Sequence, residues 1–367
     1  MNHAARPITG PSAVTSAFSA FSGFPPFFYS PGTVLDVELP TLLDSNFLFS
    51  KSTSHLPNCP LGCIMKLAAK LPLRILTHNI RYATSSPFKG ERPWAERRQL
   101  LLNELQYNTR HQNAFICLQE VLHNQLVDIH TGLNSSHSDS ASQTWEYIGV
   151  GRDDGFEAGE YSPIFYQPTV WELRDWETVW LSETPSVPSK SWDAASTRIV
   201  TVGVFTHRAS RRTVLALNTH LDDQGSRSRY EAAHIILGKV EEYRTRSAPF
   251  GGRSISGVFL AGDFNSQEDQ EAYTVLTAPE SPLADAAKLV APTEHYGHYV
   301  TWTGFGYEGQ PPTRIDYILL ESTADKVCSH GRQPWTVEGY AVLENRFEDG
   351  IFNSDHRAVV VDVLLGE

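Results

Sequence analysis

Residues 261–265 (AGDFN) place an aspartate and an asparagine two positions apart at the end of an apolar run. The run VFLAG before Asp263 is typical of a buried strand, and side chains two apart on an extended segment point the same way. Asp263 and Asn265 can therefore face one ligand. A carboxylate that holds a hard cation or a water, beside an amide that donates to an oxygen, suits hydrolysis of a phosphate ester. Asp-x-Asn also makes a good turn, so the motif gains weight only from matching residues elsewhere.

Polar residues of the same kinds follow other apolar runs of the chain: Asn79, Glu120, Glu160, His220, Asp222, Asp316, Asp355 and His356. Loops held by a rigid sheet are where binding and catalytic residues concentrate. Structural explanations exist for each residue taken singly. Asn79 could cap a turn, Glu120 could be an acid at a helix start, and His220 could be a core histidine. The recurrence of the pattern favours one shared site.

Apolar periodicity predicts the elements that position these residues. The expected helices are 94–107, a segment ending at 129, 228–244 and 268–276. The expected strands are 73–80, 114–121, 145–152, 160–166, 170–181, 198–207, 212–221, 258–265, 314–320, 337–344 and 356–365. Many short strands with few long helices predict two packed sheets flanked by helices in one α/β domain.

The chain resembles the endonuclease/exonuclease/phosphatase superfamily through six ordered motifs. They are THNI (77–80), LQEV (118–121), NTHLD (218–222), GDFN (262–265), RIDYIL (314–319) and SDHRAV (354–359). The resemblance is nearest the carbon-catabolite-repressor deadenylase and nocturnin branch. It implies a DNase-I-like α/β fold, a four-layer sandwich of two packed mixed β-sheets flanked by helices. It also implies a phosphoesterase that depends on Mg²⁺ or Mn²⁺.

The same resemblance implies roles on the metal side and around the attacking water. Glu120 and Asn79 are expected as metal ligands, and Asp355 as a further carboxylate on the metal side. Asp263 is expected to orient or deprotonate the water, and Asn265 to donate to the scissile phosphate.

On the phosphate side, His220 resembles the histidine that stabilises charge on the phosphoryl oxygens. Asp316 and His356 resemble a buried acid–histidine pair, in which the acid orients the imidazole ring. Glu160 matches a position that holds an active-site Glu or Tyr in some branches. The chemistry asks for these residue types because an anionic phosphate needs cations and donors around its oxygens, and a base for the water.

Four residues are expected to bind substrate: Arg152, Tyr161, Arg198 and Trp302. Arg198 is a planar donor suited to phosphate, but it could equally pair with Asp193. Trp302 could stack on a base or sugar, or belong to the core. Asp222 and Arg229 resemble a pattern of the superfamily and could also form a structural ion pair.

Composition limits the partners of the protein. The formal net charge of −12 over 367 residues argues against nonspecific binding of long duplex nucleic acid. It leaves room for RNA, a short single strand or a small phosphoester. No apolar run reaches the roughly 18 residues of a membrane span. Four cysteines without a disulfide framework fit a reducing compartment. We expect a cytoplasmic monomer that does not bind membranes.

The first part of the chain differs from the rest. Residues 1–70 are rich in Ser, Pro, Phe and Ala and lack the period of a helix or a strand. This composition predicts a disordered or dispensable extension, with Met65 as an alternative start. Residues 71–367 are expected to form the catalytic domain.

Three functions remain open from the sequence. The first is a phosphodiesterase or nuclease, such as a 3′-to-5′ exonuclease on RNA or short single strands. The second is a phosphatase or phosphodiesterase on a small metabolite, such as a sugar, inositol or nucleotide phosphate. The third is an inactive binding module, which is disfavoured because no expected acid, amide or histidine is missing.

Overall fold

The computed structural model describes residues 70–135, 144–246, 254–306, 309, 311–322 and 333–366. All of them belong to one unit of the chain, Met65–Glu367. The expected extension, including Met65, lies outside the described residues except for Lys70.

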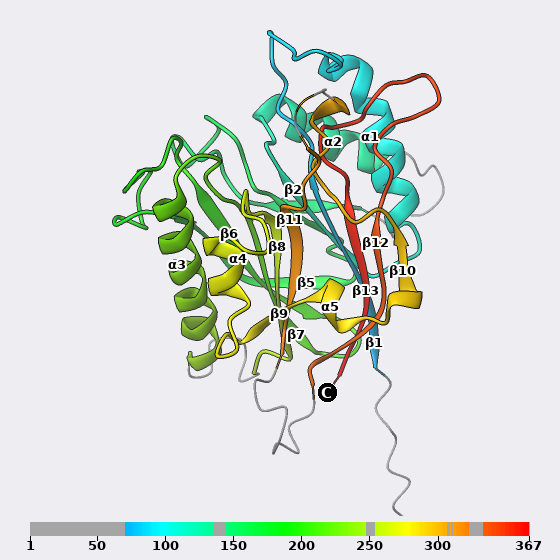
Figure 1. Ribbon diagram of the computed structural model, residues 1–367. Helices are drawn as coiled ribbons and strands as arrows, with labels where there is room; N and C mark the ends of the chain where they lie inside the picture. The colour runs from blue at the N-terminus through cyan, green and yellow to red at the C-terminus, as the bar shows by residue number, and fades with distance from the viewer. Residues whose placement is uncertain are drawn as a thin grey trace, which may run out of the picture. The chain divides into compact units, whose positions relative to one another are not determined.

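Two mixed β-sheets form the centre of this unit (Figure 1). The first contains, in spatial order, β10 (His295–Gly297), β12 (Trp335–Val342), β13 (Val359–Leu365), β1 (Leu71–Asn79), β2 (Ala114–Gln119), β4 (Ile164–Tyr166) and β3 (Glu146–Ile148). The second contains β5 (Trp171–Trp180), β6 (Ile199–His207), β7 (Thr213–His220), β8 (Gly257–Asp263), β11 (Asp316–Glu321) and β9 (Leu283–Asp285). The pairs β1–β2, β7–β8 and β10–β12 run parallel, and the other pairs run antiparallel.

Helices cover the outer faces of the two sheets. Helices α1 (Trp94–Thr109) and α2 (His123–Ser135) pack on the first sheet, and α3 (Ser226–Thr245) and α4 (Glu271–Leu276) pack on the second. Figure 1 shows α3 and α4 to the left of the strands and α1 and α2 at the upper right. A short helix α5 (Ala286–Leu289) and two 3₁₀ turns, η1 (Pro292–Glu294) and η2 (Gly304–Gly306), complete the described elements. The predicted four-layer α/β sandwich is confirmed.

The strand period of two explains the three apolar layers. In β1, Leu73 and Ile75 face the core between the sheets, while Leu76 faces α1 and α2. Phe115 is central to the inner core, with its ring 4.9 Å from that of Phe205 and 5.5 Å from that of Phe259. The central strands of both sheets are therefore apolar on both faces, which is why these strands read as nearly continuous apolar runs.

The predicted elements differ from the structure mainly at their ends. The strand predicted to reach residue 265 ends at Asp263, because Asn265 takes a left-handed backbone with φ 45°. Helix α4 begins at Glu271, three residues after the predicted start. Strands β9 and β10 were not predicted, since three residues are too few to show a period. No helix in the described parts of the chain is long and apolar enough to cross a membrane.

The strand register gathers the polar residues at one edge. Asn79 at the end of β1 pairs with Gln119, the residue before Glu120. His220 at the end of β7 pairs with Asp263, and Asp263 pairs with Asp316 across β8 and β11. Parallel strands thus end side by side and bring their following residues to one place.

Candidate active site

A cleft of about 690 Å³ opens at this edge. The predicted site residues that line it are Glu120, Arg152, Glu160, Arg198, His220, Asp263, Asn265, Trp302, Asp355 and His356. Of the remaining predicted residues, Asp316 and Asn79 lie directly behind the lining, while Tyr161 lies elsewhere.

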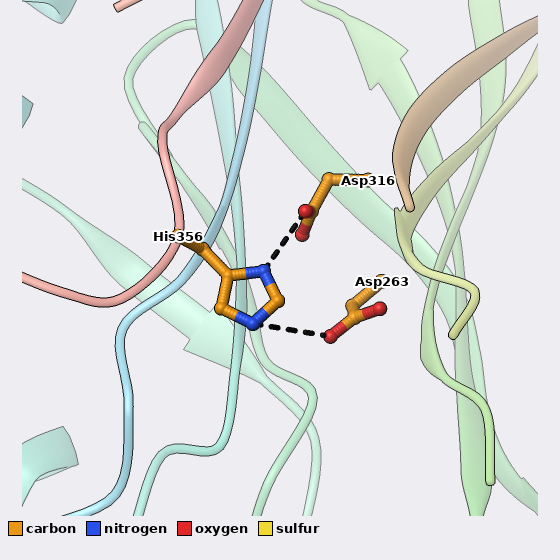
Figure 2. Close-up of side chains that lie close together, drawn as sticks. All are labelled: Asp263, Asp316 and His356. Carbon is orange, nitrogen blue, oxygen red and sulfur yellow. Dashed lines mark hydrogen bonds and ion pairs between the residues drawn. The ribbon is translucent and has the colours of Figure 1, made fainter. Parts of the chain in front are cut away.

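His356 stands between two acids (Figure 2). Its Nδ1 lies 2.9 Å from Asp316 Oδ2, and its Nε2 lies 3.7 Å from Asp263 Oδ2. Burial alone would lower the pKa of His356, but the carboxylates of Asp316 and Asp263 raise it to about 10. The predicted acid–histidine pair is assembled, and His356 carries a positive charge at neutral pH.

The oxygen and nitrogen atoms of Asp263, Asp316 and His356 lie within 4.8 Å of one another, close enough to hold a metal ion. His356 Nδ1 is already bonded to Asp316, so only Nε2 of this ring remains for a further partner. The protonated form of His356, which its raised pKa favours, places a positive charge between the two acids.

Asp263 is buried at the floor of the cleft. Burial, and then repulsion from Asp316, raise its pKa well above the usual range for an aspartate. Its Oδ1 accepts from the backbone N–H of Asn265 at 2.8 Å, and its Oδ2 accepts from Asn79 at 2.9 Å. A carboxylate whose pKa lies close to neutrality is suited to take a proton from water.

A steric constraint explains why the GDFN motif has glycine at position 262. Gly262 has a φ of +146°, and a Cβ at this position would lie 2.0 Å from the carbonyl oxygen of Thr219. Only glycine lets β8 approach β7 this closely just before Asp263.

Asn79 orients carboxylates rather than presenting an oxygen to the cleft. Its Nδ2 donates to Glu120 Oε1 at 3.0 Å and to Asp263, while its Oδ1 accepts from the backbone N–H of Arg81. The expectation that Asn79 is itself a metal ligand is thus not matched by its orientation. Asn79 links Glu120 to Asp263.

Glu120 and Asp355 form the acidic wall of the cleft. Glu120 accepts from the backbone N–H of Tyr82 at 3.1 Å and lies 3.6 Å from Arg81 Nη1. Burial raises the pKa of Asp355 against the opposing charge of His356, and Glu120 adds to the rise. Two mutually repelling carboxylates that face one cleft provide the hard oxygen ligands that Mg²⁺ prefers. Their donor set fits a divalent cation.

His220 and Asn265 face each other across the cleft floor. Asn265 Nδ2 lies 3.0 Å from the carbonyl oxygen of Leu221 and 3.0 Å from His220 Nε2. Burial, and then the charge of Arg198, lower the pKa of His220 well below its usual value. A neutral His220 carries one ring proton, and both ring nitrogens face a carboxylate: Nδ1 lies 3.6 Å from Glu160 Oε2, and Nε2 lies 3.5 Å from Asp263 Oδ2. The Asn265 amide has two hydrogens, and one of them is bonded to the Leu221 carbonyl oxygen. Only the hydrogen directed at His220 can therefore be donated to a phosphate.

Glu160 and Tyr161 point in different directions. Arg152 donates two hydrogen bonds to Glu160, of 2.7 and 3.0 Å, and both side chains line the cleft. The hydroxyl of Tyr161 donates to the carbonyl oxygen of Phe156, and the residue is buried behind the cleft wall. Neighbouring side chains of an extended segment face opposite sides, so Glu160 and Tyr161 cannot both reach the cleft.

Arg198 pairs with Asp222 and Asp223, not with Asp193. Its Nε lies 3.4 Å from Asp222 Oδ2, and its Nη2 lies 2.8 Å from Asp223 Oδ1. Asp193 instead accepts from backbone N–H groups at the start of α3. The carboxylate of Asp222 does not reach Arg229, which donates to the Asp222 backbone oxygen and to Glu271.

Asp222 is expected to stabilise the fold rather than take part in chemistry. Burial would raise the pKa of Asp222, but backbone N–H groups of Ser196, Gly225 and Ala195 lower it to about 2. Asp222→Asn replaces a carboxylate oxygen with an amide N–H group, which faces the backbone N–H groups that the carboxylate accepted from. The free energy of unfolding should therefore fall by about 3 kcal/mol. Urea unfolding at pH 7 measures this loss.

The neighbouring Asp223→Asn is the matched control, because Asp223 is half-exposed and its loss should cost less than about 1 kcal/mol. The pKa of Asp222 is depressed in the folded state. Its stabilisation is therefore present above the unfolded pKa of about 3.9 and is lost as the pH falls through about 2. Equal losses in the two variants would contradict the structural role.

Sequence patterns missed a buried network beneath the cleft. Gln119 donates to Asn218 Oδ1 at 2.7 Å, and Asn218 donates to the backbone oxygens of Leu118 and Pro163 at 2.8 Å. These bonds join β2 to β7 across the two sheets. Gln119 precedes Glu120 in the motif LQEV, and Asn218 lies two residues before His220 in the motif NTHLD. Membership of these motifs was the signal available in the sequence.

Arg81 was also missed, although it lines the cleft beside Glu120. Arg81, Glu120 and Asn265 all have left-handed backbones, with φ values of 59°, 57° and 45°. Non-glycine residues rarely adopt this region, and they do so where the surrounding structure fixes them.

Comparisons with known proteins agree with this geometry. The model of the endonuclease/exonuclease/phosphatase family matches residues 76–356. An endonuclease/exonuclease/phosphatase from Bacteroides vulgatus is similar at 29% identity over 81% of this chain and 100% of its own, with a TM-score of 0.67. A mannosyl-6-phosphatase from Bacteroides thetaiotaomicron shares 28% identity over 79% of this chain and 99% of its own, with a TM-score of 0.66. The human nocturnin catalytic domain has the same fold at 19% identity over 80% of this chain and 93% of its own, with a TM-score of 0.56. No curated protein sequence matches significantly.

Proposed function

The chain belongs to the endonuclease/exonuclease/phosphatase family, and we propose that it is a metal-dependent phosphomonoesterase acting on a small phosphorylated metabolite. Phosphoester chemistry is common to the family and its structural neighbours. The finer assignment rests on the charge distribution of the cleft.

The observation that carries the proposal is the arginine pair beside His220. Arg198 is only 5% exposed, and its Nη1 has no hydrogen-bond acceptor among the described residues. Arg152 lies close enough for its charge, with that of Arg198, to lower the pKa of His220. A buried guanidinium N–H without an acceptor is costly, so a site that leaves one in a cleft wall is suited to an anion.

A terminal phosphate fits this arrangement better than a phosphodiester. A phosphomonoester presents three non-bridging oxygens and up to two negative charges, whereas a diester presents two oxygens and one charge. Beyond the bonds to Glu160, Asp222 and Asp223, each guanidinium group keeps one nitrogen without an acceptor among the described residues, Arg152 Nε and Arg198 Nη1. These donors suit the additional oxygen of a monoester.

The residues of the cleft divide the reaction between them. Asp263 takes a proton from the attacking water, the water oxygen bonds to phosphorus, and the bond to the leaving alcohol oxygen breaks. The leaving oxygen gains a proton from solvent, and Asp263 releases its own. His356 holds positive charge beside Asp263, and Arg198 stabilises charge on the phosphoryl oxygens. An anion beside His220 favours its protonated, donating form.

Glu120 and Asp355 would hold Mg²⁺ or Mn²⁺ when the metal binds. The metal would supply Lewis-acid stabilisation of charge on the phosphate and leaving oxygens.

Two further facts support a small substrate. The net charge of −12 opposes the binding of a long polyanion. The similar Bacteroides thetaiotaomicron protein is named a mannosyl-6-phosphatase.

A nuclease acting on short single strands is the competing candidate. Trp302 lines the cleft and offers a face on which a base could stack. The shared fold with nocturnin is consistent with either function.

A hydrolysis screen with Mg²⁺ and Mn²⁺ separates the two candidates. It should include hexose, inositol and nucleoside monophosphates, bis-p-nitrophenyl phosphate, poly(A) and single-stranded DNA. The proposal expects a kcat/KM for the best monoester at least about 100-fold above that for any diester. Faster cleavage of a diester or of poly(A) would overturn it.

Arg198→Lys tests, in the same assay, whether the Arg198 guanidinium binds the phosphate. Lysine keeps the charge but loses the planar set of donors, so KM for the best monoester should rise by about tenfold. The matched control is Arg74→Lys, because Arg74 also makes a two-pronged contact, with Asp362, but does not line the cleft. An unchanged KM in Arg198→Lys would contradict phosphate binding by Arg198.

A further inference from the structure

A second cavity of about 510 Å³ adjoins the cleft on its metal side. Trp302 and Asp355 line both spaces, and the other walls of the second cavity include Phe88, Lys89 and Phe305. Whatever fills this cavity therefore lies directly beside the candidate metal ligand Asp355.

The wall that carries Phe305 is held in an unusual backbone. Phe305 has a φ of +56° between Gly304 and Gly306, which have φ values of +56° and +69°. Its ring packs edge-on against Phe352 at 6.0 Å. Thr303 anchors the segment by donating from its backbone and hydroxyl to the Asp355 carbonyl oxygen, at 2.7 and 2.9 Å. A left-handed phenylalanine costs energy and persists only where its surroundings fix it.

The opposite wall is also fixed, although its aromatic ring is exposed. Phe88 is 63% exposed, while its backbone N–H donates to Glu91 at 2.9 Å. The guanidinium of Arg81 lies 4.9 Å from the centre of the Phe88 ring, and Arg81 also reaches Glu120. An exposed ring on an anchored loop, linked to the metal side, is available for contact with a ligand.

We propose that this second cavity binds the leaving group of the substrate, and that the leaving group is a sugar ring. The inference rests on the proposed function. In-line displacement places the leaving oxygen opposite the attacking water. With the water at Asp263, the leaving oxygen points away from Asp263, and the second cavity adjoins the metal-side carboxylate Asp355 on the cleft wall.

The lining selects a sugar over other alcohols. The aromatic faces of Phe88 and Trp302 can pack against the C–H face of a saturated sugar ring. Burying this apolar face away from water lowers the free energy of binding. Lys89 and Asp355 supply a donor and an acceptor for ring hydroxyls at the same wall. A short acyclic alcohol reaches too little of this surface to benefit.

The test compares glucose 6-phosphate with glycerol 3-phosphate and AMP in the wild-type protein and in Phe88→Ala. We expect Phe88→Ala to lower kcat/KM for glucose 6-phosphate by about tenfold and to leave glycerol 3-phosphate within about twofold. The matched control is Phe156→Ala, because Phe156 is a similarly exposed phenylalanine, at 69%, that lines neither space. It should change neither substrate.

Three outcomes overturn the inference: equal losses for the two substrates, no loss for the sugar phosphate, or a selective loss for AMP alone. Binding is tested independently of turnover by saturation-transfer NMR with free glucose as the probe. Glucose signals in the wild type that weaken in Phe88→Ala support the subsite even if no monoester is hydrolysed, in which case only the proposed function fails. The absence of transfer to glucose in the wild type overturns the subsite.

Discussion

Asp263→Asn is expected to lower kcat by about 10³-fold while the protein remains folded. Asparagine keeps the size of the side chain and the bond from the Asn265 backbone, but it cannot take a proton from water. The raised pKa of Asp263 comes from burial and from the nearby Asp316, so the native carboxylate is destabilised in its charged form. Asparagine also turns an amide nitrogen toward Asn79 Nδ2 and loses that hydrogen bond. Removing the charge relieves repulsion from Asp316, and the two effects offset each other. The free energy of unfolding should therefore change by less than about 1 kcal/mol.

The matched control is Asp285→Asn, at another buried strand end of the same sheet. Asp285 makes two hydrogen bonds with Arg314, of 2.7 and 2.9 Å, and does not line the cleft. Its loss leaves the buried Arg314 guanidinium with Glu268 as its remaining ionic partner and should cost about 3 kcal/mol, with much less effect on kcat. Single-turnover kinetics and urea unfolding measure both quantities. If Asp263→Asn instead lost stability and kept its turnover, Asp263 would be structural.

Residue order along the chain predicted most of the fold because the strands are long enough to show their apolar character. Parallel neighbouring strands end at the same edge of a sheet. This brings together the motifs that follow the parallel pairs β1–β2 and β7–β8. Short strands such as β9 escaped prediction because three residues carry no period. The residues before position 70 lie outside what the structure describes.

Side-chain orientation could not be predicted at the same level. Asn79 was expected to present an oxygen to a metal, yet its amide nitrogen faces Glu120 and Asp263. Tyr161 was expected to bind substrate, yet the alternation of an extended segment turns it away from the cleft. Arg81 depends on a left-handed backbone that no propensity predicts for arginine. Motifs locate a residue, whereas its hydrogen-bond partners decide which atom it offers.

Glu120→Gln is expected to raise the Mg²⁺ concentration for half-maximal activity by about 100-fold. A neutral amide binds a hard cation far more weakly than a carboxylate does. Glu120 and Asp355 are the two proposed metal ligands among the described residues that line the cleft. Calorimetric titration of Mg²⁺ or Mn²⁺ into the substrate-free protein should show the same weakening. The effect would then be one of binding rather than of chemistry.

The control separates metal binding from the ion pair with Arg81. Glu91 also pairs with Arg81, at 3.3 Å against 3.6 Å for Glu120, but it does not line the cleft. If Glu120 acts only by holding Arg81, then Glu91→Gln should weaken metal activation just as strongly. If Glu120 holds the cation, Glu91→Gln should lower stability and leave the Mg²⁺ response unchanged. An activity that survives EDTA in the wild-type protein would overturn the metal assignment altogether, because Glu120 and Asp355 would then have no cation to hold.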